Sequence, residues 1–147
     1  MFSLYKGQSV FLTGHTGFKG AWMAEWLLQL GAQVTGYSID IPTTPSLFEE
    51  LGLPARLEDL RGDVRELGSL RKAMQAAEPT VVFHLAAQAL VRESYDDPIG
   101  TFATNIMGTA NVLEAARSVP SVKAIVVVTT DKVYENTELG KPFRESD

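Results

Sequence analysis

Three short apolar runs, separated by segments of helical periodicity, constrain the fold of this chain most strongly. The runs are Ser9–Thr13 (SVFLT), Thr80–Ala86 (TVVFHLA) and Ala124–Thr129 (AIVVVT). A strand that is buried on both faces loses its alternation of polar and apolar residues and becomes continuously apolar. Such strands, separated by helices, are typical of βαβ units in which a parallel sheet carries helices on both faces. We therefore expect all three runs to be strands buried on both faces.

The intervening segments supply the remaining elements of a single domain over residues 1–147. We predict helices over Gly20–Leu30, Leu67–Ala77 and Pro98–Ser118, further strands over Gln33–Ile39 and Arg56–Gly62, and one helical turn at Leu47–Leu51. Right-handed crossovers then give strand order 3-2-1-4-5 in a doubly wound, Rossmann-type α/β sheet with three αβα layers. Ligands of such sheets bind in the crevice between the first and fourth strands.

Composition excludes several classes of function. The formal net charge is -5 and the 13 Lys and Arg residues are scattered, so we expect no nucleic-acid partner. The chain has no cysteine and only two distant histidines, so we expect neither disulfides nor a metal site. It shows no secretory signal and no run of about 18 apolar residues, which predicts a cytoplasmic protein without a membrane span.

A glycine-rich loop, TGHTGFKG, follows the first predicted strand and opens the first predicted helix. This is the context in which such a loop binds a dinucleotide. Gly14 permits a tight turn, Gly17 lets the backbone approach a diphosphate, and Gly20 lets the helix pack closely on the strand. The helix N-terminus adds free N–H groups and partial positive charge. Thr16, Phe18 and Lys19 complete the predicted cofactor loop, with Lys19 adding a cation. A plain turn before a helix is the alternative reading of the glycines.

Acidic residues follow the second and third predicted strands. Asp40 lies twenty residues beyond Gly20, where a carboxylate accepts hydrogen bonds from an adenosine ribose and repels a 2′-phosphate, which favours NAD over NADP. Asp63 and Val64, in GDVR, are placed to meet the adenine. The alternative for Asp63 is an N-cap of the helix that begins near Leu67.

Further motifs carry a family resemblance. TGHTGFKG, GDVR, HLAAQALVRESY, TNIMGT and TTDKVYEN resemble the extended short-chain dehydrogenase/reductase superfamily, and within it the CDP-glucose 4,6-dehydratase family of nucleotide-sugar enzymes. The resemblance covers essentially the whole chain. It implies an NAD-dependent lyase that converts CDP-glucose to CDP-4-keto-6-deoxyglucose, in deoxysugar and O-antigen lipopolysaccharide biosynthesis. The sugar is oxidised at C4, loses water across C5 and C6, and is reduced at C6.

The same resemblance assigns site residues. It implies that Thr130 bonds the C4 oxygen, Asp131 protonates the departing C6 hydroxyl and Lys132 removes the C5 proton. The alternative reading of these three residues is a capped strand end. Further cofactor-binding residues implied by the resemblance are Leu85, Ala86, Ala87, Gln88, Asn105 and Thr129. The implied substrate-binding residues are Gln88, Arg92 and Ser94. An ordered surface loop is the alternative for the segment after the fourth strand, and a plain helical asparagine is the alternative for Asn105.

One expected feature of the superfamily is missing from the sequence. Its catalytic Tyr-x-x-x-Lys pair does not occur, because no tyrosine is followed four residues later by lysine. The resemblance therefore implies an N-terminal half without its C-terminal substrate domain, which binds NAD but turns over little or no CDP-sugar alone. It also implies a homodimer through helix Pro98–Ser118. Without its usual neighbour, this helix would expose Ile99, Phe102 and Ile106 and promote association.

Two other functions stay open. One is a related sugar-nucleotide epimerase, or a dTDP- or GDP-sugar dehydratase. The other is a non-catalytic NAD-binding module. A simple epimerase needs no acid at C6, so the Asp131–Lys132 pair favours a dehydratase.

Four side chains have no predicted ligand role. Trp22 and Trp26 lie one helical turn apart and are predicted to pack on the sheet. His84 lies in an apolar strand and is predicted to be a hydrogen-bonded core histidine. His15 lies in the glycine loop, where we expect its backbone to contribute more than its ring.

Overall fold

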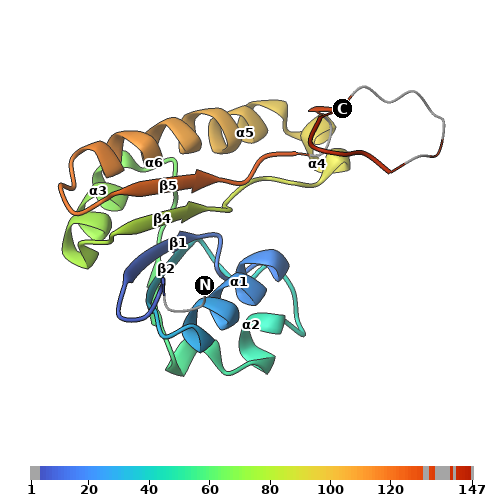
Figure 1. The fold of residues 1–147 in the computed structure, drawn as a ribbon. Coiled ribbons are helices and arrows are strands. Elements are labelled where there is room, and N and C mark those ends of the chain that lie inside the picture. The colour runs from blue at the N-terminus through green and yellow to red at the C-terminus, as the bar shows by residue number, and fades with distance from the viewer. Residues whose placement is uncertain (1–3, 131–132, 135–139, 141, 147) are drawn as a thin grey trace.

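The computed structural model describes residues 4–130, 133–134, 140 and 142–146 (Figure 1). The elements in chain order are β1 (Ser9–Thr13), α1 (Phe18–Gln29), β2 (Gln33–Ser38), α2 (Leu47–Glu50), the 3-10 turn η1 (Leu53–Ala55), β3 (Glu58–Arg61), α3 (Leu67–Ala77), β4 (Val81–His84), α4 (Val91–Asp96), α5 (Pro98–Phe102), the π-helical segment η2 (Ala103–Met107), α6 (Gly108–Arg117) and β5 (Ala124–Val127). No helix among these residues is long and apolar enough to cross a membrane.

The five strands form one parallel sheet in the order β3-β2-β1-β4-β5, which confirms the predicted topology. Strand β1 lies in the middle, with Phe11 opposite Thr35 of β2 and Val82 of β4. Helices α1 and α2 cover one face of the sheet, and α3 and α6 cover the other (Figure 1). The carboxyl ends of β1 and β4 therefore lie side by side, and this is where the chain order reverses.

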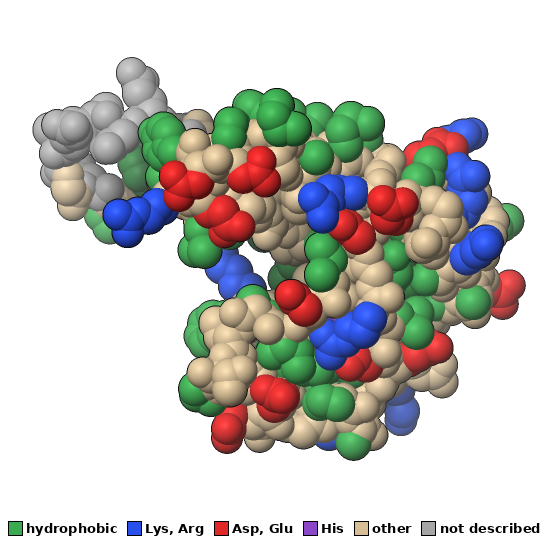
Figure 2. Space-filling view, turned by 180° about the vertical axis from the view of Figure 1, so that it is seen from behind, with side chains coloured by type: hydrophobic (Ala, Val, Ile, Leu, Met, Phe, Trp, Pro, Cys, Tyr) green, Lys and Arg blue, Asp and Glu red, His purple; other side chains and the backbone are tan. Residues whose placement is uncertain are grey.

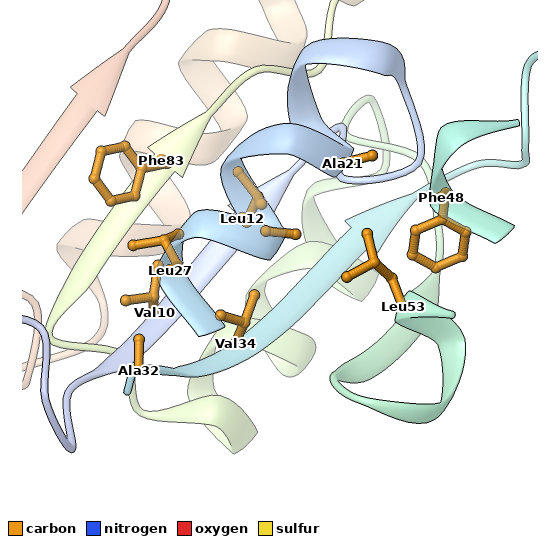
Figure 3. Close-up of a cluster of buried hydrophobic side chains, with 10 residues drawn as sticks. Val10, Leu12, Ala21, Leu27, Ala32, Val34, Phe48, Leu53 and Phe83 are labelled. Atoms are coloured by element: carbon orange, nitrogen blue, oxygen red, sulfur yellow. The ribbon is translucent and has the colours of Figure 1, made fainter. Parts of the chain in front are cut away.

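Each face of the sheet has its own hydrophobic core, and β1 contributes to both. Val10 and Leu12 lie next to Leu27 of α1, and Phe48 and Leu53 belong to the same core on the side of β2 (Figure 3). Phe11 points the other way, into the core formed with α3 and α6. Because successive side chains of a strand alternate between faces, burial on both faces explains why the run is continuously apolar.

Strand β5 corrects one sequence-based expectation. We predicted burial on both faces, but Ile125 is 37% exposed and Val126 is 44% exposed. Within the described part of the chain β5 pairs only with β4, so it is an edge strand with one neighbour. A continuously apolar run cannot by itself distinguish an edge strand from a central one.

The helical region before β5 is more complex than predicted. The predicted helix Pro98–Ser118 contains the π-helical segment η2, in which the N–H of Gly108 donates to the carbonyl of Ala103. The short helix α4 was not predicted. As expected, Ile99, Phe102 and Ile106 are exposed. Figure 2 shows hydrophobic side chains gathered along the top of the molecule, over this helical run.

Helix α1 contradicts the prediction for its tryptophans. Trp22 is 54% exposed and Trp26 is 56% exposed, whereas we expected both to pack on the sheet. The buried side of α1 consists mainly of small residues, namely Gly20, Ala21 and Ala24, with Leu27 at its end. Small side chains let the helix lie close to β1 and β2, which leaves no room for indole rings between them.

We predict that Leu70→Ala lowers the free energy of unfolding by about 2–5 kcal/mol, because it leaves a cavity at a fully buried position of α3. Leu113→Ala on α6 is the matched control, since this leucine is 44% exposed. The control should change the stability by less than about 1 kcal/mol. Urea denaturation of both variants measures the difference, and equal losses would contradict the assignment of the core.

Candidate functional site

The glycine loop brings the end of β1 against the end of β4. Gly14 has a φ of +77°, which favours glycine, and an added Cβ would lie 2.7 Å from the backbone nitrogen of Ala86. At Gly20, an added Cβ would overlap the carbonyl oxygen of Gly14. The turn therefore needs glycine at both positions, and the start of α1 packs on the turn itself.

The N-terminus of α1 is open to an anion. Gly17 is the N-cap, no side chain caps the helix, and the first turn carries no acidic residue. Phe18 and Lys19 occupy the first turn and are exposed. The unpaired N–H groups and the helix dipole at such an end attract phosphate groups. Thr16 ties the loop to the end of β2, because its hydroxyl donates to the carbonyl of Asp40 at 2.6 Å.

A first cleft lies beside this loop, at the carboxyl ends of β1, β2 and β4. Its empty volume is about 650 Å³. The lining residues are Gly14, Thr16, Gly17, Tyr37, Ser38, Ile39, Asp40, Pro42, Gly62, Val64, Leu85, Ala86, Ala87 and Thr104. Small residues and backbone dominate near β1 and β4, which leaves space for a ligand to pass close to the main chain.

The two acidic residues predicted to bind adenosine differ in their environment. Asp40 is exposed and lines the first cleft. The Asp63 carboxylate instead accepts bonds from the backbone N–H of Arg65 at 2.8 Å and from its Nε at 2.7 Å. Burial raises the pKa of Asp63, but these bonds to Arg65 outweigh burial and hold the pKa below its ordinary value. Gly62 and Val64, on either side of Asp63, line the cleft, and the N-cap of α3 is Glu66.

A second cleft, with an empty volume of about 1030 Å³, lies at the ends of β4 and β5. Its lining residues are His84, Ala86, Ala87, Gln88, Ala89, Asn105, Thr109, Val127, Val128, Thr129 and Thr130. Ala86 and Ala87 line both clefts, so the two meet at the end of β4. Figure 2 shows the surface hollowed on this side of the molecule, below the grey segment. An elongated ligand could occupy both clefts.

Asn105 clamps the chain where it leaves β4. Its Oδ1 accepts the backbone N–H of Gln88 at 2.8 Å, and its Nδ2 donates to the Gln88 carbonyl at 2.9 Å. The Gln88 side chain bonds Thr101 and the backbone of Leu90. The segment after β4 is thus held against α5 and η2.

The predicted catalytic and substrate residues fall into three groups. Thr130 is exposed, lines the second cleft and follows Thr129 at the end of β5. Asp131 and Lys132 lie outside the described residues. Arg92 and Ser94 lie on α4 and line neither cleft, and the Ser94 hydroxyl donates to the carbonyl of Val91.

The His15 ring has a role that the sequence did not reveal. The ring is fully buried and bonds Asp59 Oδ1 on β3 at 2.8 Å and Ser38 Oγ on β2 at 2.9 Å. It packs edge-on against Phe48, with ring centroids 5.1 Å apart, and fills the space that a Cβ at Gly36 would need. Burial lowers the pKa of His15, despite the opposing effect of Asp59. The ring therefore anchors the glycine loop to the outer half of the sheet.

Sequence reasoning missed several residues of the two clefts. Ser38 ends β2 and Ile39 follows it, directly before Asp40, so their position in the chain was a usable signal. Thr104 and Thr109 reach the clefts from the helical run, and only the three-dimensional packing reveals them. Among the described residues, no group of three His, Cys, Asp or Glu side chains could hold a metal ion.

The comparisons with known proteins agree with this geometry. The family described as GDP-mannose 4,6 dehydratase matches residues 11–147. A CDP-glucose 4,6-dehydratase of Salmonella typhimurium is 47% identical, over 99% of this chain and 40% of its own length. UDP-glucuronate 4-epimerase 2 of Arabidopsis thaliana is 33% identical, over 96% of this chain and 33% of its own length.

Solved structures of related enzymes share the fold. The crystal structure of a Thermus thermophilus UDP-glucose 4-epimerase in complex with NAD has a TM-score of 0.79 and 30% identity. The match covers 93% of this chain and 42% of that one. The chain thus spans well under half the length of the relatives that it matches.

We predict that acid weakens the fold through its two histidines. Burial lowers the pKa of both His15 and His84 below the ordinary value of 6.5, so the unfolded state binds more protons just below that pH. The stabilisation is complete above pH 6.5 and is lost as the pH falls below it, by up to about 1.4 kcal/mol per pH unit for each histidine. Urea denaturation at a series of pH values measures the slope.

The variant His15→Gln serves as the control for this prediction. Its amide can still donate to Asp59 but does not titrate, so its stability should depend less steeply on pH in this range. A slope equal to that of the original chain, or a stability that rises on acidification, would contradict the assignment.

Proposed function

The chain belongs to the GDP-mannose 4,6 dehydratase family, and we propose that it forms the NAD-binding part of an enzyme that dehydrates a nucleotide-linked hexose. The proposed substrate is CDP-glucose and the product is CDP-4-keto-6-deoxyglucose. The observation that supports this function most strongly is the pair of clefts that meet at Ala86 and Ala87. One cleft has the features of a diphosphate and adenosine site, and the other is lined by Thr130.

The first cleft fits the adenosine and diphosphate half of NAD. The open N-terminus of α1 and the backbone at Gly17 suit the diphosphate, because nothing but the Gly14 carbonyl lies within 4 Å of an added Cβ at Gly17. The exposed carboxylate of Asp40 suits the ribose hydroxyls. Val64 and the backbone of Gly62 suit the flat face of the adenine ring. When bound, NAD supplies the reversible oxidation of a sugar carbon.

The second cleft suits the nicotinamide and the sugar. We assign to Thr130 a hydrogen bond to the C4 oxygen, to Asp131 the proton for the departing C6 hydroxyl, and to Lys132 the removal of the C5 proton. A lysine base at neutral pH requires a pKa lowered by desolvation or by a nearby cation. The proposed contacts of the sugar nucleotide are Gln88, which lines this cleft, and Arg92 and Ser94, which lie on α4 outside both clefts.

The choice of reaction rests on similarity and on one acidic residue. The relative with 47% identity is a CDP-glucose 4,6-dehydratase, whereas relatives near 30% identity include 4-epimerases. Epimerisation is therefore the second candidate. Dehydration needs an acid at C6 and epimerisation does not, and Asp131 can provide that acid.

We also propose that the protein acts in the cytoplasm as a homodimer, in the synthesis of deoxysugars for cell-surface polysaccharides. The exposed apolar residues Ile99, Phe102 and Ile106 support association through the α5–α6 helical run.

We predict that the chain binds NAD more tightly than NADP, and that Asp40→Asn narrows this preference by about tenfold, because removing the carboxylate removes its repulsion of a 2′-phosphate. Titration calorimetry with each cofactor measures the ratio of dissociation constants. Asp96→Asn is the matched control, since this exposed aspartate lies on α4 and lines neither cleft. An unchanged ratio in the Asp40 variant would refute the assignment.

We predict dehydratase activity when residues 1–147 are joined to the C-terminal part of the Salmonella relative. The fusion should convert CDP-glucose to a product lighter by one water, as mass spectrometry can show. In the fusion, Asp131→Asn should slow the loss of water by about 10²–10⁴-fold and leave oxidation at C4 intact.

The unmodified relative is the positive control for this experiment. Normal dehydration by the Asp131 variant would overturn the role of this acid. A fusion that binds NAD but yields an epimer in place of the dehydrated sugar would favour the second candidate.

A further inference from the structure

A chain of hydrogen bonds runs through the sheet beneath both clefts, and His84 is at its centre. His84 is only 2% exposed. Its Nδ1 lies 2.6 Å from Thr13 Oγ1 on β1, and its Nε2 lies 3.0 Å from Thr109 Oγ1 on α6. One ring thus links the middle of the sheet to the helix that covers it.

The Thr109 end of this series of hydrogen bonds fixes the direction of the bond between Thr109 and the ring, and the burial of Thr13 fixes the direction at the other end. The Thr109 hydroxyl donates to the Asn105 carbonyl at 2.7 Å, an oxygen that can only accept. At the other end, the backbone N–H of Ala86 can only donate, and it does so to Thr13 Oγ1 at 3.2 Å. A hydroxyl has a single hydrogen, so Thr109 can accept from the ring but cannot also donate to it.

The protonation state of the ring follows from this direction. His84 carries a hydrogen on Nε2, because Thr109 can only accept from the ring. Thr13 is fully buried, so its hydrogen needs an acceptor, and an unprotonated Nδ1 at 2.6 Å provides one. This neutral form satisfies all the donors and acceptors in the chain. A second proton on Nδ1 would leave the buried Thr13 hydrogen without its acceptor. Burial also lowers the pKa of His84, in agreement with the neutral form.

We propose that His84 is a positioning residue that acts through Thr109 to set the place of Asn105 at the second cleft. Asn105 is held on both sides. Its backbone carbonyl accepts a hydrogen bond from the Thr109 hydroxyl, and its side-chain amide forms two hydrogen bonds with the backbone of Gln88. Ala86, at the other end of this series of hydrogen bonds, lines both clefts. The catalytic meaning of this arrangement rests on the proposed function, whereas the hydrogen-bond chain does not.

The tautomer of His84 tests the chain of bonds directly. The protein contains only two histidines, so a ¹⁵N-histidine label gives few signals in a long-range ¹H–¹⁵N spectrum. The signals that vanish in His84→Gln belong to His84. At neutral pH we expect a neutral ring with hydrogen on Nε2 only. A ring with hydrogen on Nδ1, a charged ring, or a mixture of the two tautomers would overturn the proposal.

A matched pair of variants tests whether the ring acts on Asn105. His84→Gln places an amide at the same bond distance from the backbone as Nε2, so it can still donate to Thr109. His84→Asn places its amide at the distance of Nδ1, so the Thr109 oxygen loses the hydrogen that Nε2 donates and keeps only its bond to the Asn105 carbonyl. The readout is hydrogen exchange of the Gln88 N–H, which donates to Asn105.

We expect the Gln88 N–H to exchange about tenfold faster in His84→Asn than in His84→Gln. The Phe11 N–H, in the middle of β1, is the internal reference, because a general loss of stability would accelerate both amides alike. If the exchange rate of the Gln88 N–H, divided by that of the Phe11 N–H, were equal in the two variants, the positioning role would be overturned. Failure of the original chain to bind NAD would instead count against the proposed function alone.

Discussion

The close approach of the Gly14 turn to the backbone of Ala86 determines the arrangement of everything around it. The end of β1 can lie this near to the end of β4 only because residue 14 has no side chain, and α1 can begin on top of the turn only because residue 20 has none either. The two clefts open on the same spot, since Ala86 belongs to both. The sheet brings the two chain segments to the same edge, and the absence of two Cβ atoms lets them meet.

The parts of the structure that the sequence predicted well depend on local pattern or on connectivity. The apolar run of β1 and the helical spacing of α3 each span enough residues to reveal their period, and the strand order follows from right-handed crossovers. The glycine loop could be recognised because its spacing and its position after a strand are both local features.

The errors arose where packing between distant segments decides the outcome. The helical period placed Trp22 and Trp26 on α1 but did not show which side of the helix faces the sheet. The side with small residues packs on the sheet, and both tryptophans are exposed. The ring of His15 meets Asp59, which lies 44 positions further along the chain, so no local pattern could indicate that bond. Helix α4 is six residues long, too short for a period to show. The positions of Thr104 and Thr109 at the clefts likewise depend on how the helical run lies over the sheet.

The π-helical segment η2 has a geometrical consequence for the helical run that contains it. A wide turn fits one additional residue into the helix with almost no gain in length, so all that follows is rotated by roughly 100° relative to a regular α-helix. Before η2, the run presents Ile99 and Phe102 outward, and after it Val112 and Ala115 face the core. The wide turn therefore changes the face that α6 presents to the sheet relative to a regular α-helix. Asn105 lies within η2, so the hydrogen bonds that hold the backbone of Gln88 come from the segment with the wide turn.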